Sequence, residues 1–182
     1  MGEPTAAQPV NLVCPTLAAR EEWLGAARRA LEAEFGPVDM ESDTWEWTFS
    51  RYYEDEMGGP LLRRMFGFRS LVAPDSIVEV KLTTNRLEAE LAERLSGAPA
   101  RPVNLDPGYV SESKMVLATT KDYSHRIYLR DGIYAESTLR WRSGVFEPWE
   151  WTYNDYRTDE YRAFFADVRE RYRQKLAESG GN

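Results

Sequence analysis

The stretch S-I-V-E-V-K-L-T-T-N-R-L-E-A-E-L-A-E-R-L, from Ser76 to Leu95, decides the fold because it predicts a helix in the middle of the chain. Ser76 and, three residues later, Glu79 form a capping box, which is a local signal for a helix start. Apolar residues then recur at helical spacing, and Gly97–Pro102 ends the pattern. The inner stripe comprises Val80, Thr84, Leu87, Leu91 and Leu95.

Short apolar runs predict strands on both sides of this helix. Leu61–Leu71 before it and Val103–Leu105 after it read as strands. Thr44–Phe49 alternates large aromatic and polar residues, which is the period of a half-buried strand. Val10–Cys14, ended by Pro15, predicts a buried first strand.

A first helix is expected between the first two strands. Thr16 is a candidate cap, and Gly36–Pro37 stops the helical pattern. The apolar stripe comprises Leu24, Ala27, Leu31 and Phe35. The predicted order is therefore strand, helix, strand, strand, helix, strand, which is the α+β, ferredoxin-like split βαβ order.

The rest of the chain extends this core. The pattern leaves Ser111–Ala118 open between a short helix and a strand. Arg126–Leu129 and Ile133–Trp141, joined through Asp131-Gly132, predict a β-hairpin. A last helix begins near Thr158. The chain thus reads as a single domain over residues 1–182, with residues 1–9 and 179–182 expected to be disordered.

Composition narrows the function classes. The net charge is −7 and the sequence pI is about 4.9, which disfavours binding to a phosphate backbone. Two basic pairs, Arg63–Arg64 and Arg140–Arg142, are interpreted as solvated faces. There is one cysteine, Cys14, and one histidine, His125, so a disulfide within the chain and a His/Cys zinc site are not expected; no metal ligands are assigned, and only a hard, oxygen-ligated ion remains open.

Targeting and nucleotide-binding patterns are missing from the sequence. Residues 1–9 do not resemble a signal peptide, and no apolar run reaches the length of a membrane span, so we expect a cytoplasmic protein. The phosphate-loop and dinucleotide-binding patterns do not occur, nor do the serine-hydrolase and zinc-protease patterns. The sequence specifies no cofactor and no oligomeric state.

Two tryptophan-rich segments repeat one another. Trp45–Glu56 reads W-E-W-T-F-S-R-Y-Y-E-D-E and Trp149–Glu160 reads W-E-W-T-Y-N-D-Y-R-T-D-E, so seven of the twelve positions are identical. One interpretation is two similar strand-and-turn segments that present aromatic side chains to the core. The other is a paired site in which Glu56 and Glu160 face each other.

Three polar stretches are candidates for a site. Lys81, Asn85 and Glu88 share one helix face. Asn104-Leu105-Asp106-Pro107-Gly108-Tyr109 ends a predicted strand, and Thr119–Arg126 concentrates hydroxyls, cations and the single histidine. Hydroxyls with Lys and Arg suit an oxyanion. The alternatives are a solvated helix face, an ordinary turn, and a histidine that fixes a hairpin.

We expect these stretches to converge on one polar pocket. In this hypothesis His125 is a general acid or base, while Asp106 and Glu136 orient the other groups or hold a divalent ion. The residues expected to bind the ligand are Lys81, Asn85, Asn104, Thr120, Lys121 and Arg126. The expected ligand is a small anion, and a phosphorylated molecule is one candidate. The alternative is that the protein is a non-catalytic interaction or regulatory domain.

Several stretches together resemble a known bacterial family. They are K-L-T-T-N-R-L-E (Lys81–Glu88), N-L-D-P-G-Y (Asn104–Tyr109), A-T-T-K-D-Y-S-H-R-I-Y-L (Ala118–Leu129), D-G-I-Y-A-E (Asp131–Glu136), F-G-P-V-D (Phe35–Asp39) and W-T-Y-N-D-Y-R (Trp151–Arg157). The family that they resemble is domain of unknown function 4416. The resemblance implies a bacterial, cytosolic, stand-alone protein, and it brings no established activity or catalytic residue.

Overall fold

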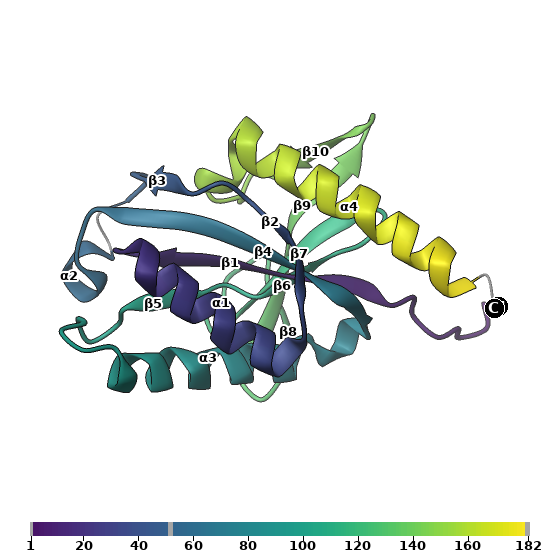
Figure 1. Ribbon diagram of the computed structural model, residues 1–182. Coiled ribbons are helices and arrows are strands. Elements are labelled where there is room, and N and C mark those ends of the chain that lie inside the picture. The colour runs from purple at the N-terminus through teal and green to yellow at the C-terminus, as the bar shows by residue number, and fades with distance from the viewer. Residues whose placement is uncertain (1, 51–52, 181–182) are drawn as a thin grey trace.

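The computed structural model describes residues 2–50 and 53–180 and shows an α+β fold built on one large antiparallel sheet (Figure 1). The strands are β1 (Val10–Ala18), β2 (Val38–Glu41), β3 (Trp45–Trp47), β4 (Leu61–Val72), β5 (Val103–Leu105), β6 (Gly108–Val110), β7 (Lys114–Thr119), β8 (Ile127–Arg130), β9 (Ile133–Arg142) and β10 (Val145–Pro148). The helices are α1 (Glu21–Phe35), α2 (Glu54–Met57), α3 (Ile77–Arg94) and α4 (Asp159–Gly180), with short 3-10 turns η1 (Pro74–Ser76) and η2 (Asp155–Arg157).

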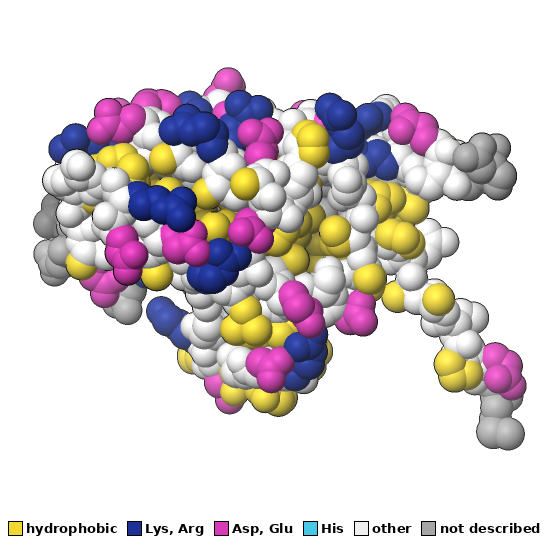
Figure 2. Space-filling view, turned by 60° about the horizontal axis from the view of Figure 1, so that its bottom comes forward, with side chains coloured by type: hydrophobic (Ala, Val, Ile, Leu, Met, Phe, Trp, Pro, Cys, Tyr) yellow, Lys and Arg dark blue, Asp and Glu magenta, His cyan; other side chains and the backbone are white. Residues whose placement is uncertain are grey.

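The sheet runs in the order β10-β9-β7-β6-β1-β4-β2, while β3 pairs with β4, β5 with β1 and β8 with β9. Helices α1 and α3 cover one face and α4 covers the other (Figure 1). Charges of both signs are interspersed over the face that Figure 2 presents. Arg86 of α3 pairs with Glu34 of α1 at 2.9 Å, which joins the two helices.

Strand β1 lies at the centre and is buried along its whole length. Its side chains alternate between the two layers: Leu12 and Cys14 join the core under α1 and α3, while Val13 joins the core under α4. A strand covered on both faces reads as a continuous apolar run instead of an alternating one. This explains why β1 begins with the apolar run Val10–Cys14 in the sequence.

Strand β1 continues past Pro15 to Ala18, so the predicted end at Cys14 was wrong. On this side of β1 the partner changes from β6, opposite Asn11–Val13, to β5, opposite Thr16–Ala18. Pro15 sits at the change of partner, between the residues that pair with β6 and those that pair with β5, so the N–H that it lacks is not needed for either pairing. Its carbonyl accepts a hydrogen bond from the Asp106 amide at 2.9 Å.

Two predicted helix caps were also wrong, although both helices form. Thr16 lies within β1, and α1 begins only at Glu21, after Arg20. The Ser76 hydroxyl donates to the Ala73 carbonyl at 2.7 Å and does not cap α3. In both cases the apolar stripe predicts the helix, whereas the exact capping geometry depends on the preceding turn.

The second half of the chain completes the sheet. The open segment is strand β7, and the predicted hairpin is confirmed as β8 and β9. Asp131 and Gly132 both have positive φ, 53° and 75°, as an Asp-Gly hairpin turn requires. Helix α4 extends through Gly180, so Ser179 is helical; residues 1, 181 and 182 of the segments expected to be disordered lie outside the described residues.

Candidate functional site

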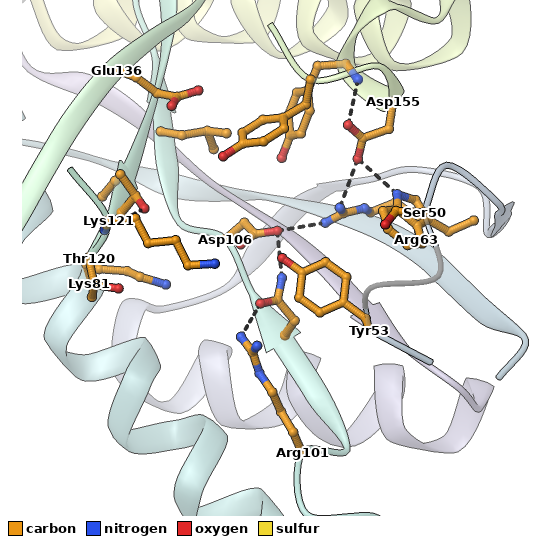
Figure 3. A pocket seen from close by; sticks show the side chains of 17 residues that line it. Ser50, Tyr53, Arg63, Lys81, Arg101, Asp106, Thr120, Lys121, Glu136 and Asp155 are labelled. Carbon is orange, nitrogen blue, oxygen red and sulfur yellow. Dashed lines mark hydrogen bonds and ion pairs between the residues drawn. The ribbon is translucent and has the colours of Figure 1, made fainter. Parts of the chain in front are cut away.

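A pocket of about 480 Å³ opens between β4, the β5–β6 turn, α3 and the segment that ends at η2 (Figure 3). Its volume is within the range of small-molecule sites. Its lining residues are Trp47, Ser50, Tyr53, Arg63, Lys81, Arg101, Asn104, Asp106, Leu117, Ala118, Thr119, Thr120, Lys121, Glu136, Tyr153, Asp155 and Tyr156. Figure 3 shows Lys81, Thr120 and Lys121 on one side of Asp106, and Arg63, Ser50 and Asp155 on the other.

Arg63 holds two walls of the pocket together. Its buried guanidinium donates to Asp106 Oδ2 and to Asp155 Oδ2, at 3.1 Å each. Trp47 Nε1 donates to the same Asp155 oxygen at 3.0 Å. The guanidinium is therefore fully ion-paired, so Arg63 shapes the pocket and needs no further anion to neutralise it.

The β5 wall is held by a second polar chain. Asn104 Nδ2 donates to Asp106 Oδ2 at 2.7 Å, and Arg101 donates to Asn104 Oδ1. Arg101 also pairs with Glu88 at 3.2 Å, and Glu88 accepts a hydrogen bond from the Leu105 amide at 2.7 Å. Burial raises the pKa of the Glu88 carboxyl, although Lys81 and Arg101 nearby oppose this. These contacts fix the turn that carries Asp106.

Lys81 differs from the paired cations around it. It is 7% exposed, and within the described part of the chain its ammonium makes one hydrogen bond, to the Leu105 carbonyl at 3.0 Å, and no ion pair. An ammonium carries three donors. The buried Lys175 shows the usual arrangement, because it donates to Asn11 Oδ1, to Asp39 and to the Phe68 carbonyl. Lys81 therefore has donor capacity left on the wall of the pocket.

Three tyrosines, Tyr53, Tyr153 and Tyr156, also line the pocket. Burial raises the pKa of Tyr53 to about 12, and it also raises the pKa values of Tyr153 and Tyr156. All three side chains are consequently neutral phenols at neutral pH. The Tyr153 hydroxyl accepts a hydrogen bond from Arg126 at 2.5 Å.

Glu136 enters the pocket from β9 and is supported from behind. Its Oε2 faces His125 Nε2 at 3.2 Å and Arg126 Nε at 2.8 Å, and its Oε1 accepts a hydrogen bond from Thr138 at 3.2 Å. The imidazole of His125 is stacked on the Trp151 ring, with centroids 5.2 Å apart. Histidine and arginine thus contact the carboxylate from outside the cavity lining.

The structure brings six of the nine predicted site residues to the pocket lining, namely Lys81, Asn104, Asp106, Thr120, Lys121 and Glu136. His125 and Arg126 are outside the lining and contact Glu136. Asn85 is on α3 and does not line the pocket.

Sequence reasoning missed Arg63, Arg101, Tyr53, Tyr153, Asp155 and Tyr156. Arg63 was interpreted as part of a solvated basic face, but it is 2% exposed and doubly ion-paired. Its neighbour Arg64 pairs with Glu21 at 2.6 Å. The repeated segments were the available signal, since one contributes Trp47 and Tyr53 and the other Tyr153, Asp155 and Tyr156.

The two repeated segments meet at the pocket without sharing a conformation. The first forms strand β3, whereas Trp149–Tyr153 forms a turn before η2. Trp47 is 8% exposed and the equivalent Trp151 is 37% exposed. Glu56 pairs with Arg101 at 3.6 Å, and residues 51–52 of the first segment lie outside the described residues.

No group of three or more His, Cys, Asp or Glu side chains placed to hold a metal ion occurs among the residues that the structure describes. Asp106 and Glu136 both line the pocket, but they do not form such a group. In residues 2–50 and 53–180, no helix has the length and apolar character to cross a membrane.

Comparison with known proteins identifies the family. No curated protein and no solved structure matches the chain. The family model described as Domain of unknown function (DUF4416) matches residues 8–172, which include every pocket-lining residue. Because that match spans most of the sequence, the chain belongs to the DUF4416 family.

Proposed function

We propose that the protein binds, or acts on, a small anionic ligand in this pocket, either a phosphate monoester or a carboxylate. Lys81 carries the proposal, because a buried ammonium with one hydrogen bond and no direct ion pair to a described residue is costly unless an anion joins it. The other buried cation among the described lining residues, Arg63, pairs with Asp106 and Asp155.

The groups beside Lys81 suit an oxyanion. Thr120 and Lys121 line the same side of the pocket (Figure 3), and hydroxyls together with ammonium groups are common phosphate and carboxylate ligands. The volume of about 480 Å³ would hold a metabolite-sized molecule.

Glu136 is the group best placed to move a proton if the ligand reacts. It lies on the pocket wall, and His125 Nε2 contacts its far side at 3.2 Å. A carboxylate backed by an imidazole is a common general acid–base arrangement. In this proposal Arg126 is a positioning residue, because it holds both Glu136 and the Tyr153 hydroxyl.

Thermal-shift measurements with inorganic phosphate, glycerol 3-phosphate, glycerate and acetate test the binding proposal. At least one of these anions should raise the melting temperature of the wild type, because a ligand that binds the folded state stabilises it. Lys81→Met should abolish the shift. Lys114→Met removes the same charge from an exposed position on β7 and should keep the shift. A shift that survives in Lys81→Met would contradict the proposed role of Lys81.

An interaction domain is the second candidate. Several aromatic and aliphatic side chains are exposed on β8 and near it, including Ile127 at 70%, Tyr128 at 57% and Trp151 at 37%. A photo-crosslinking residue placed at Tyr128 should then give a defined protein adduct in the host cell. The same residue at exposed Asp75 is the control. Equal labelling at both positions would speak against this candidate.

We also propose the finer assignments that the sequence suggested. A ferredoxin-like split βαβ core over β1 to β5 is supported by the antiparallel pairing of β1 with β4 and β5, and of β4 with β2 and β3. A bacterial cytoplasmic setting is supported by the family resemblance and by the single, buried cysteine. The net charge of −7 favours a small-molecule partner over nucleic acid.

A further inference from the structure

We infer that the hydroxyl of Tyr156 selects the ligand: the pocket is built for an anion that carries a second oxygen, apart from its anionic group, to hydrogen-bond this phenol. The inference rests on the proposed function, and it names the ligand class more closely as a hydroxylated phosphate or carboxylate.

The Tyr156 hydroxyl is a buried polar group that lacks a partner. The residue is 2% exposed and lines the pocket, and its hydroxyl oxygen has no hydrogen bond to any described residue. A buried hydroxyl left unpaired costs about 1–3 kcal/mol. Native proteins leave few such groups, and those at a cavity wall are candidates for pairing with a bound molecule.

The ring of Tyr156 packs against two aromatic neighbours and its backbone is hydrogen-bonded, so the hydroxyl has little freedom to find another partner. It stacks on Phe165 with centroids 5.9 Å apart and an interplanar angle of 8°, and it meets Tyr161 edge to face at 5.8 Å. Its backbone N–H donates to Asp155 Oδ1 at 3.1 Å. This packing holds the phenol in one orientation.

Tyr156 and Lys81 form two separate anchors. Lys81 comes from α3, whereas Tyr156 follows Asp155 in η2, and Figure 3 shows Lys81 and Asp155 on opposite sides of Asp106. The Tyr153 hydroxyl is already engaged by Arg126. An inorganic anion held at Lys81 would leave the Tyr156 hydroxyl unpaired, whereas a hydroxylated anion would pair both groups.

Two matched pairs of probes test this selection. Glycerol 3-phosphate and propyl phosphate share one anionic group and differ by two hydroxyls; glycerate and propionate form the carboxylate pair. Calorimetric titration of the wild type should show about tenfold tighter binding of the hydroxylated member of the pair that the pocket accepts, because one net hydrogen bond is worth about 1 kcal/mol or slightly more. The pair that binds identifies the anionic group.

Tyr156→Phe removes only the hydroxyl and should abolish the preference, so that both members of a pair bind with about equal affinity. The loss should come from weaker binding of the hydroxylated probe alone. Tyr161→Phe is the matched control, because Tyr161 contacts the Tyr156 ring and does not line the pocket. This control should keep the wild-type preference. Melting curves of all three proteins without probe should agree within a few degrees.

Each outcome decides between the two proposals. Binding of a probe pair without a hydroxyl preference in the wild type, or a preference that persists in Tyr156→Phe, overturns the role of Tyr156 and leaves the anion site standing. Failure of all four probes to bind the wild type overturns the anion site as well. If Tyr156→Phe does not fold, the wild-type preference itself remains the deciding measurement.

Discussion

Two buried lysines offer a direct comparison between a structural and a ligand-binding ammonium. Lys175→Met would leave the buried Asn11 amide oxygen and the Phe68 carbonyl without the hydrogen bonds that they accept from Lys175, and it would remove the ion pair with Asp39. Breaking a buried ion pair in this way costs about 3–5 kcal/mol. That is a large share of the roughly 5–15 kcal/mol that stabilises a typical domain.

Lys81→Met should behave differently in the absence of ligand. The substitution gives up one hydrogen bond to a neutral carbonyl, worth about 1 kcal/mol. It also removes a buried charge that makes no direct ion pair with a described residue, which offsets the loss. We therefore expect a change in the free energy of unfolding of less than about 1 kcal/mol.

Urea denaturation followed by tryptophan fluorescence measures both effects, with wild type and Lys114→Met as references. The slopes should agree between variants, so that the midpoints report stability. If Lys81→Met lowers the free energy of unfolding as much as Lys175→Met does, Lys81 is a structural lysine and the reasoning behind the anion site is refuted.

Three further predictions concern single residues. Burial raises the pKa of the Cys14 thiol to about 12, so a thiol reagent at pH 8 should react only as fast as the protein unfolds, and immediate reaction of the native protein would contradict this. Burial also raises the pKa of Glu88 above its ordinary value of 4.5, so above that pH the folded state binds more protons than the unfolded state. The stability of Glu88→Gln relative to wild type should therefore increase as the pH rises from 4.5 towards neutrality. A difference in the free energy of unfolding that stays constant with pH in urea titrations would show an unshifted carboxyl. A Cβ on Gly108 would lie 2.2 Å from the Val116 carbonyl oxygen, so Gly108→Ala should destabilise the fold by about 1–3 kcal/mol. Gly25→Ala in α1, where the added Cβ would lie 3.6 Å from its nearest neighbour, should stabilise the fold by about 0.5–1 kcal/mol. Equal urea midpoints for the two variants would contradict the close approach of β6 to β7.

The sequence predicts elements where periodicity decides them and fails where a distant partner decides them. The apolar stripe of α3 and the Asp131-Gly132 turn are local signals, and both correspond to the structure. Pro15 reads as a strand end in the sequence. Strand β1 accommodates this proline because its pairing partner changes there from β6 to β5. No local pattern contains that information.

The candidate site shows the same division. Polar residues concentrated in short stretches, such as Asn104–Asp106 and Thr120–Lys121, were found because their density is visible in the sequence. Arg63 was missed because an arginine within a strand reads as a solvated side chain, and its burial depends on Asp155, 92 positions away. Tyr156 looked like one more core aromatic.

The clamp at Arg63 also affects how the chain acquires its binding site. The guanidinium joins a strand from the first half of the chain to η2, which directly precedes the last helix. A nascent or partly unfolded chain without its C-terminal segment would lack Asp155 and Tyr156, and with them one side of the cavity. Recognition would therefore arise only at completion of folding, and occupancy should slow amide hydrogen exchange in β4 and η2 together, as one cooperative unit.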